Sequence, residues 1–201
     1  MRSADFDEIL RSKSADRNSY DSGDWFNRID WTLKSNNWGV GLPPANGNQG
    51  DWNIIGPALA DANLKPGAKD IDGTYRHMLE MLVIRKTSGL FRLRTAEDIQ
   101  KSVSFFNVGP NQVPGLIVER IQNTAKSCFP VSEAVVLVNA TPQSQTFSDP
   151  AFKKQPLLLH PVQAVSKDPV VRTSKFQKST GTFTIPARTT AVFVEPCIGF
   201  K

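Results

Sequence analysis

Residues 16–27 form the part of the sequence richest in side chains that could do chemistry. Within twelve residues they contain three carboxylates, an arginine, two amides and three aromatic rings: Asp16, Arg17, Asn18, Tyr20, Asp21, Asp24, Trp25, Phe26 and Asn27. Such a set suits a carbohydrate, because these polar groups pair with sugar hydroxyls and an aromatic ring packs against the apolar face of a sugar. A structural alternative stays open, in which Asp21 and Asp24 cap turns, Arg17 pairs with one of them, and the tryptophans are core residues.

The rest of the sequence offers little catalytic chemistry. His77 and His160 have no neighbours at metal-ligand spacing, so both are interpreted as packed or surface histidines, and no metal site is predicted. Segment 39–41 lacks the third glycine and the preceding strand of a nucleotide-binding loop. Cys128 and Cys197 are too few for a disulfide scaffold, and the sequence leaves open whether they pair.

Length and charge limit the function classes. The 201 residues, 39% hydrophobic and 21% charged, suffice for one sizeable core or two modest ones. The formal net charge is +5, and six basic residues between Lys153 and Lys178 accompany one acid, Asp168. Because these charges are dispersed among predicted strands and are not clustered with aromatic residues that could stack on bases, we interpret them as a solvated face and expect no nucleic-acid partner.

Membrane insertion and export have no support within this sequence. No apolar run approaches the roughly 18 residues that a spanning helix requires. Acidic residues follow Met1 closely, where a signal peptide would have its apolar segment. We therefore expect no membrane contact and no targeting signal in this chain.

The elements that must position these side chains change type along the chain. All four tryptophans fall within the first 52 residues, and turn residues interrupt segment 19–53, which predicts an ordered loop. The clearest helix follows, because apolar residues recur there at three- and four-residue steps. These residues are Ile71, Tyr75, Met78, Leu79, Leu82 and Val83. Shorter helical turns are predicted at 7–13 and 57–63.

Beyond residue 95 the pattern changes from helix to strand. Short runs of β-branched and aromatic residues, separated by turn residues, lie at 103–106, 115–121, 134–139, 157–160, 170–172, 182–185 and 190–194. About seven strands in this length is the spacing of an antiparallel sandwich.

Several motifs resemble one enzyme family from Asp7 onward. They lie at 7–14, 16–17, 19–20, 22–27, 36–44, 90–93, 107–110, 113–115, 159–163 and 193–197. Together they resemble the C-terminal part of pullulanase-type starch debranching enzymes, which belong to the α-amylase class, and most closely the limit dextrinases of plants and green algae. The most specific match is the run from Arg11-Ser12-Lys13-Ser14 to Trp25-Phe26-Asn27.

The resemblance implies a part of a glycoside hydrolase that cleaves α-1,6 branch points of starch, limit dextrins and pullulan. Such retaining hydrolysis needs two carboxylates that flank the scissile bond. The family's catalytic carboxylates are expected upstream of this chain, so no catalytic residue is assigned here. The implied partners are a branched α-glucan and the N-terminal barrel of the same polypeptide.

The resemblance also implies which residues touch the glucan. Arg17 and a carboxylate after the Pro43-Pro44 pair should form part of the substrate-binding wall. Alignment on Trp52 places Gly50 where related enzymes carry an aspartate, so Asp51 either replaces that contact or the contact is lost. The surrounding side chains should support the loop: Asp16, Tyr20, Asp24, Trp25, Asn37 and Trp38.

The expected architecture is therefore mixed. Residues 1–95 should be the helical, loop-rich C-terminal end of a (β/α) barrel, and residues 96–201 an all-β antiparallel sandwich. The resemblance further implies a plastid stroma location, no cofactor in this segment, and calcium as an open question for the full-length enzyme. The alternative interpretation is a stand-alone, non-catalytic glucan-binding or scaffold module derived from such an enzyme.

Overall fold

The computed structural model describes residues 7–20, 23–124 and 130–196. These residues form two compact units, which divide between Leu79 and Glu80. Asp21, Cys128 and Cys197 lie outside the described residues, so the open pairing of the cysteines is not addressed by the structure.

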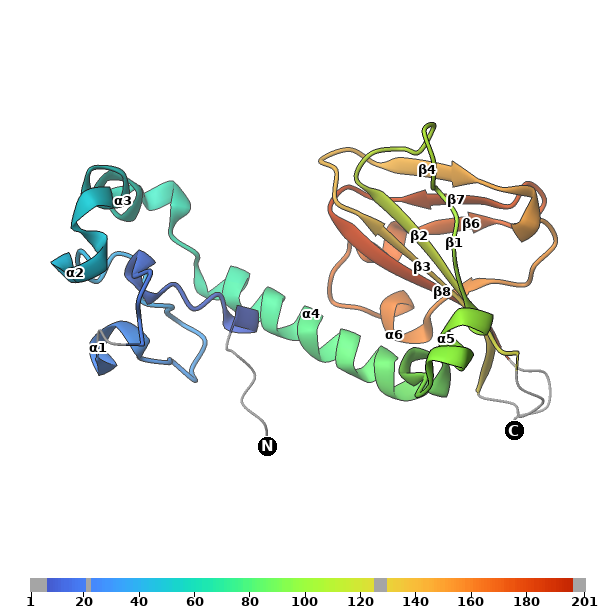
Figure 1. The fold of residues 1–201 in the computed structure, drawn as a ribbon, viewed down its shortest axis with the longest axis horizontal. Coiled ribbons are helices and arrows are strands. Elements are labelled where there is room, and N and C mark those ends of the chain that lie inside the picture. The colour runs from blue at the N-terminus through green and yellow to red at the C-terminus, as the bar shows by residue number, and fades with distance from the viewer. Residues whose placement is uncertain (1–6, 21–22, 125–129, 197–201) are drawn as a thin grey trace. The chain divides into compact units, whose positions relative to one another are not determined.

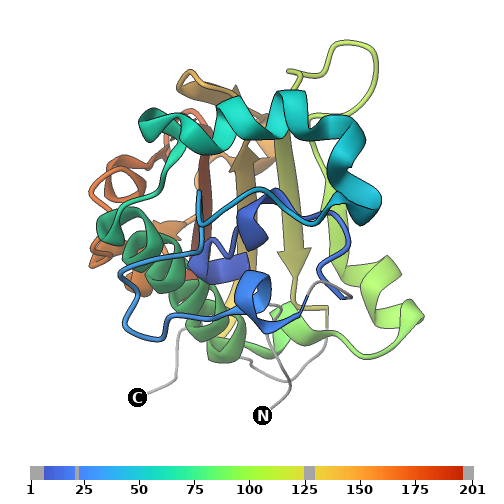
Figure 2. The ribbon, with the colours of Figure 1, turned by 90° about the vertical axis from the view of Figure 1, so that its left-hand side faces the viewer.

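The N-terminal unit consists of short helical segments joined by loops (Figure 2). They are η1 (Asp7–Ile9), η2 (Lys13–Ala15), α1 (Asp24–Asn27), α2 (Ala45–Asn48), η3 (Gln49–Asp51), α3 (Trp52–Ala60), η4 (Ala62–Leu64) and the first part of α4 (Ala68–Thr87). The helical turn predicted at 7–13 is confirmed for η1 alone, because residues 10–12 are not helical and η2 begins only at Lys13. The turn predicted at 57–63 lies in α3 and η4, and α3 begins earlier, at Trp52.

The long predicted helix is confirmed as α4. The Asp70 carboxylate accepts a hydrogen bond from Gly67 N at 2.9 Å, which satisfies a backbone donor at the helix start. The Asp72–Arg76 pair, four residues apart, adds a contact of 2.6 Å on the exposed face. Ile71 and Ile84 are buried, whereas the predicted apolar residues between them, Met78, Leu79, Leu82 and Val83, are 39–50% exposed.

The C-terminal unit is built on two antiparallel sheets, drawn as two layers in Figure 1. The larger sheet has the strand order β1-β2-β3-β8-β5 and the smaller one β4-β7-β6. The strands are β1 (Val103–Phe105), β2 (Leu116–Gln122), β3 (Val131–Asn139), β4 (Gln145–Ser148), β5 (Leu158–Leu159), β6 (Lys175–Gln177), β7 (Thr182–Ile185) and β8 (Thr189–Pro196). The helical segments are η5 (Gly89–Arg92), α5 (Ala96–Ser102), η6 (Pro150–Phe152), α6 (Pro161–Ala164) and η7 (Val171–Thr173).

Two apolar clusters hold this unit together. Val135 pairs with Phe193 across β3 and β8 and belongs to the cluster that includes Phe152 and Phe183. A second cluster joins Ile84 of α4 and Leu90 of η5 to Ala134, Val192 and other apolar residues of the sheet. The alternating strands therefore have apolar partners on both faces.

The structure corrects three sequence-based predictions. Residues 96–102 form helix α5, because Thr95 caps its start by accepting a hydrogen bond from Asp98 N at 3.0 Å. The run at 170–172 is not a strand but lies at η7. Strands β4 and β6 were not predicted, since they are short and polar at alternate positions.

The compact units also divide earlier than the predicted domain boundary after residue 95. Ile84, Leu90 and Leu93 pack with the strands of the C-terminal unit, which places residues 80–95 in that unit. The structure thus confirms an antiparallel sheet domain with accompanying helices. The assignment of the first 95 residues to a barrel stays a prediction.

Candidate functional site

The candidate site begins with a backbone conformation that L-residues avoid. Lys13, Ser14 and Ala15 have φ values of 52°, 48° and 61°, so three successive residues lie in the left-handed region. Such residues cost roughly 1–2 kcal/mol each in a left-handed helical conformation. Hydrogen bonds hold the turn, because Ser12 Oγ donates to Asn36 O at 2.7 Å and Ser14 Oγ donates to Gly41 O at 2.6 Å.

The turn leads directly to Asp16 and Arg17, which hydrogen bonds to Asn48 hold in place. Asp16 is buried, and its Oδ1 accepts hydrogen bonds from Asn18 N at 3.0 Å and Asn48 Nδ2 at 2.9 Å. Arg17 N donates to Asn48 Oδ1 at 3.1 Å. The Arg17 backbone is therefore anchored while its side chain, 70% exposed, faces solvent.

The structure brings the two predicted substrate-binding residues together. Arg17 Nη1 lies 3.8 Å from Asp51 Oδ2, and the Asp51 side chain is 53% exposed. Asp51 ends η3, immediately before α3. The pair combines a planar donor fork with an acceptor carboxylate, an arrangement able to bind neighbouring hydroxyl groups.

Gly50, beside Asp51, leaves open space. Apart from its two flanking residues and the local helical backbone, no atom lies within 4 Å of a Cβ atom built at this glycine. The backbone there thus has room for a side chain, including the aspartate that the sequence resemblance places at this position.

The supporting residues divide into exposed and buried side chains. Tyr20 is 99% exposed, Trp25 is 56% exposed with the Arg28 guanidinium 5.5 Å from its ring centre, and Asp24 is exposed at the start of α1. Asn37 is buried and donates to Trp25 O at 3.1 Å and to Arg28 O at 3.2 Å. Asn37 therefore holds the end of α1 in place.

The tryptophans do not form a common core. Trp25 and Trp31 are 56% and 71% exposed, whereas Trp38 and Trp52 are half-buried. Trp52 Nε1 donates to Pro43 O at 3.0 Å. The structural alternative raised from the sequence thus fails for Trp25 and Trp31, and the described partner of Arg17 is Asp51.

Sequence reasoning missed Asn48, which is 1% exposed. It contacts residues 31 and 32 positions earlier in the chain, Arg17 and Asp16. An asparagine beside a glycine indicates a turn, and no local signal distinguishes this one from a surface turn residue.

Comparison with known proteins places this chain in a family. Residues 33–196 match the family described as α-1,6-glucosidases, pullulanase-type, C-terminal. The chain belongs to this family.

Individual pullulanases match nearly the whole chain. The chloroplastic pullulanase 1 of Arabidopsis thaliana is 48% identical over 196 residues, which are 94% of this chain and 20% of that protein. The pullulanase of Klebsiella pneumoniae is 33% identical over 193 residues. The crystal structure of the maltotriose complex of PulA from K. pneumoniae superposes with a TM-score of 0.87 at 35% identity and covers 96% of this chain and 21% of that one. The chain thus spans about a fifth of the length of these relatives.

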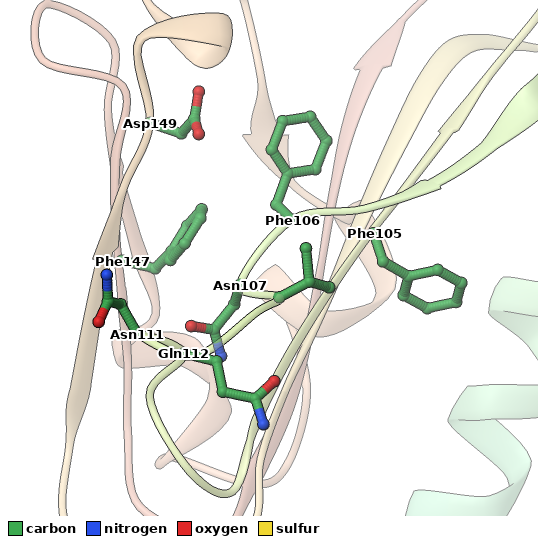
Figure 3. A pocket seen from close by; sticks show the side chains of 8 residues that line it. Phe105, Phe106, Asn107, Asn111, Gln112, Phe147 and Asp149 are labelled. Atoms are coloured by element: carbon green, nitrogen blue, oxygen red, sulfur yellow. The ribbon is translucent and has the colours of Figure 1, made fainter.

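The sandwich of this pullulanase-type domain contains a pocket (Figure 3). It measures about 380 Å³ and lies between the β1–β2 loop and β4. Two of its polar side chains already bind the loops: Asn107 Nδ2 donates to Val113 O at 2.9 Å, and Asp149 Oδ1 accepts from Ala151 N at 2.8 Å. Phe106 contacts Phe152, with ring centres 4.7 Å apart. These three contacts stabilise the fold around the pocket.

The histidines and acids of the described ranges form no metal site. Within them, no group of three or more His, Cys, Asp or Glu side chains is placed to hold an ion. His160 is buried, its Nδ1 accepts from Val162 N at 3.2 Å, and its Nε2 lies 3.1 Å from Thr87 Oγ1. Burial lowers the pKa of His160, so its neutral form caps α6. Among the same residues, no helix is long and apolar enough to cross a membrane.

Proposed function

We propose that this chain acts as the C-terminal portion of an α-1,6-glucan debranching hydrolase of the pullulanase and limit dextrinase type. The 48% identity to a chloroplastic pullulanase over 94% of the chain carries this proposal. The proposed substrates are the α-1,6 branch points of starch, limit dextrins and pullulan. The same relative supports the plastid stroma as the location.

In this proposal the two units have different roles. The N-terminal unit closes the catalytic barrel and presents Arg17 and Asp51 to the glucan. The guanidinium donates to two hydroxyls at once or to one hydroxyl and Asp51, and the carboxylate accepts from a third. The C-terminal sandwich gives structural support through its two apolar clusters.

The chemical step belongs to groups that this chain does not supply. Hydrolysis with retention requires a nucleophilic carboxylate and an acid/base carboxylate on opposite sides of the scissile bond. Arg17 and Asp51 lie on neighbouring turns and contact each other at 3.8 Å, which suits binding of sugar hydroxyls rather than this division of roles. The catalytic carboxylates are proposed to come from the barrel portion of the same polypeptide. Calcium in that portion stays an open proposal.

The family match favours this function over a stand-alone glucan-binding module, because the relatives that match the chain are themselves pullulanases. The native polypeptide tests the choice. An antibody raised against the chain should recover a protein about five times as long, in keeping with the 20% coverage of the relative, and that protein should release reducing ends from pullulan. Recovery of a 201-residue polypeptide alone would overturn the proposal.

A further inference from the structure

The Asn48 side chain connects the two chain segments that carry Arg17 and Asp51. Its Oδ1 accepts from Arg17 N at 3.1 Å, and its Nδ2 donates to Asp16 Oδ1 and to Pro44 O, both at 2.9 Å. We propose that Asn48 is the positioning residue that sets Arg17 against Asp51 for glucan binding. This inference rests on the proposed function.

The Arg17–Asp51 ion pair is too weak to fix the relative position of its two side chains. Its two side chains are 70% and 53% exposed and their charged atoms lie 3.8 Å apart. Exposed pairs of this kind contribute about 0–1 kcal/mol, because solvent screens them and both side chains stay free to move. The relative position of the two groups must therefore come from the backbone beneath them.

Asn48 fixes that backbone on the Asp51 side. It immediately precedes η3, the turn that ends at Asp51. Its side chain is 1% exposed and binds the Pro44 carbonyl at the start of α2, which sets the direction in which η3 leaves. A buried amide with both ends hydrogen-bonded has a single favoured orientation.

Asn48 also fixes the backbone on the Arg17 side. The left-handed residues Lys13, Ser14 and Ala15 precede Asp16, and strained backbone persists only where surrounding contacts over-determine it. Two of these contacts, through Asp16 Oδ1 and Arg17 N, end on Asn48. Loss of the amide would let the residues after the turn move, and Arg17 would move with them.

A double-mutant cycle in the full-length polypeptide tests this role. Asn48→Ala should lower kcat/KM on pullulan about tenfold, mainly through KM, as expected when one directional contact is lost. Because Asn48 acts through Arg17, the same change in an Arg17→Ala background should lower kcat/KM by less than twofold. Asn46→Ala is the matched control, because its side chain is exposed and only its backbone carbonyl contacts Asn48.

Additive effects of the two substitutions would overturn the inference, since a purely structural role of Asn48 predicts them. An equal loss in Asn46→Ala would also overturn it, since the effect would then not depend on the buried amide. If Asn48→Ala does not fold, Asn48→Asp takes its place in the cycle. This variant keeps the volume and the acceptor for Arg17 N but replaces the donor to Asp16 with a repelling carboxylate.

A measurement without activity separates this inference from the proposed function. If the wild-type polypeptide does not cleave pullulan, the proposed function fails. The positioning role is then judged from the guanidinium NMR resonances of Arg17 in the 201-residue chain. They should shift in Asn48→Asp as they do in Asp51→Asn, and unchanged resonances in Asn48→Asp would refute the role.

Discussion

The two units of the molecule are ordered by different interactions. Among the described residues, eighteen buried apolar side chains belong to the C-terminal unit and only Ile9, Pro43 and Ile71 to the N-terminal unit. In the N-terminal unit the buried polar side chains outnumber the apolar ones, whereas in the C-terminal unit nine buried polar side chains accompany twice as many apolar ones. Those of the N-terminal unit are Ser14, Asp16, Asn36, Asn37 and Asn48. Apolar burial supplies stability with little directionality, whereas each hydrogen bond adds only about 0.5–1.5 kcal/mol but fixes an orientation.

The backbone shows the same contrast. Six described non-glycine residues of the N-terminal unit have positive φ, namely Leu10, Lys13, Ser14, Ala15, Leu33 and Asn37, against Lys154 and Arg188 in the C-terminal unit. Hydrogen bonds from Thr32 and then Ser35 hold the pKa of Asp30 well below its usual range. One unit therefore provides stability, and the other provides directed side chains. Four experiments test this contrast.

Phe183→Ala should have the largest effect. Phe183 is fully buried, with ring centres of Phe152, Phe176 and Phe193 at 5.1, 4.6 and 5.2 Å. The cavity should lower the free energy of unfolding by about 3–5 kcal/mol, measured by denaturant titration. Phe105→Ala, at a side chain 57% exposed, is the control and should change it by less than about 1 kcal/mol. Equal losses of unfolding free energy in the two variants would show that Phe183 is not part of the stabilising core.

Limited trypsin digestion should cut the N-terminal unit first. Few apolar contacts hold its loops, so local opening costs less free energy there than in the sandwich. We expect cleavage at least about tenfold faster, a difference of about 1.4 kcal/mol. The resistant fragment should retain residues 80–95, because Ile84 and Leu90 pack with the sheets. Mass spectrometry that shows equal resistance throughout would contradict the contrast.

Arg17→Lys in the full-length polypeptide should separate function from stability. Lysine cannot reproduce the planar fork of the guanidinium, so one directional contact to the glucan is lost. This loss should weaken transition-state binding by about 1–3 kcal/mol and lower kcat/KM at least several-fold. The melting temperature should change little, because Asn48 holds the backbone at Arg17 N. Arg94→Lys, on an exposed side chain, controls for charge. A lowered melting temperature with normal kcat/KM would remove Arg17 from the substrate site.

We expect the smallest effect from His160, which should make the stability of the sandwich depend on pH. Burial lowers the pKa of His160 in the folded state below its ordinary value of 6.5, so the unfolded chain binds more protons under acid conditions. Stability should be complete above pH 6.5 and fall as the pH decreases from there through the folded-state pKa. His160→Gln should reduce this loss in denaturant titrations, while the exposed His77→Gln should retain it. Identical profiles in the two variants would exclude the effect.

Periodic elements could be predicted from the sequence, and irregular ones could not. Helix α4 and strands β2, β3, β7 and β8 carry strong apolar periods. The strand predicted at 170–172 failed because Asp168 Oδ1 accepts from Val170 N at 2.8 Å and starts a turn, a local polar contact that apolar patterning ignores.

The candidate site shows a similar limit. The sequence resemblance suggests its residues, which stay a prediction. The pairing of Arg17 with Asp51 across 34 positions depends on a left-handed turn made without glycine. Because non-glycine residues rarely adopt positive φ, no residue type in this turn indicates that conformation. Asn48, which holds the two segments together, is likewise of a residue type that is common in surface turns, so its role could not be predicted.

The open space at Gly50 has an evolutionary consequence. Because no atom beyond the flanking residues and the local helical backbone lies within 4 Å of a Cβ there, a side chain can begin at this position without a clash with more distant parts of the chain. A lineage could therefore carry acids at both positions for a time and afterwards lose either one. The negative charge beside Arg17 can move by one residue through such an intermediate without ever being absent, so a shift of the acidic position between relatives requires no loss of the site.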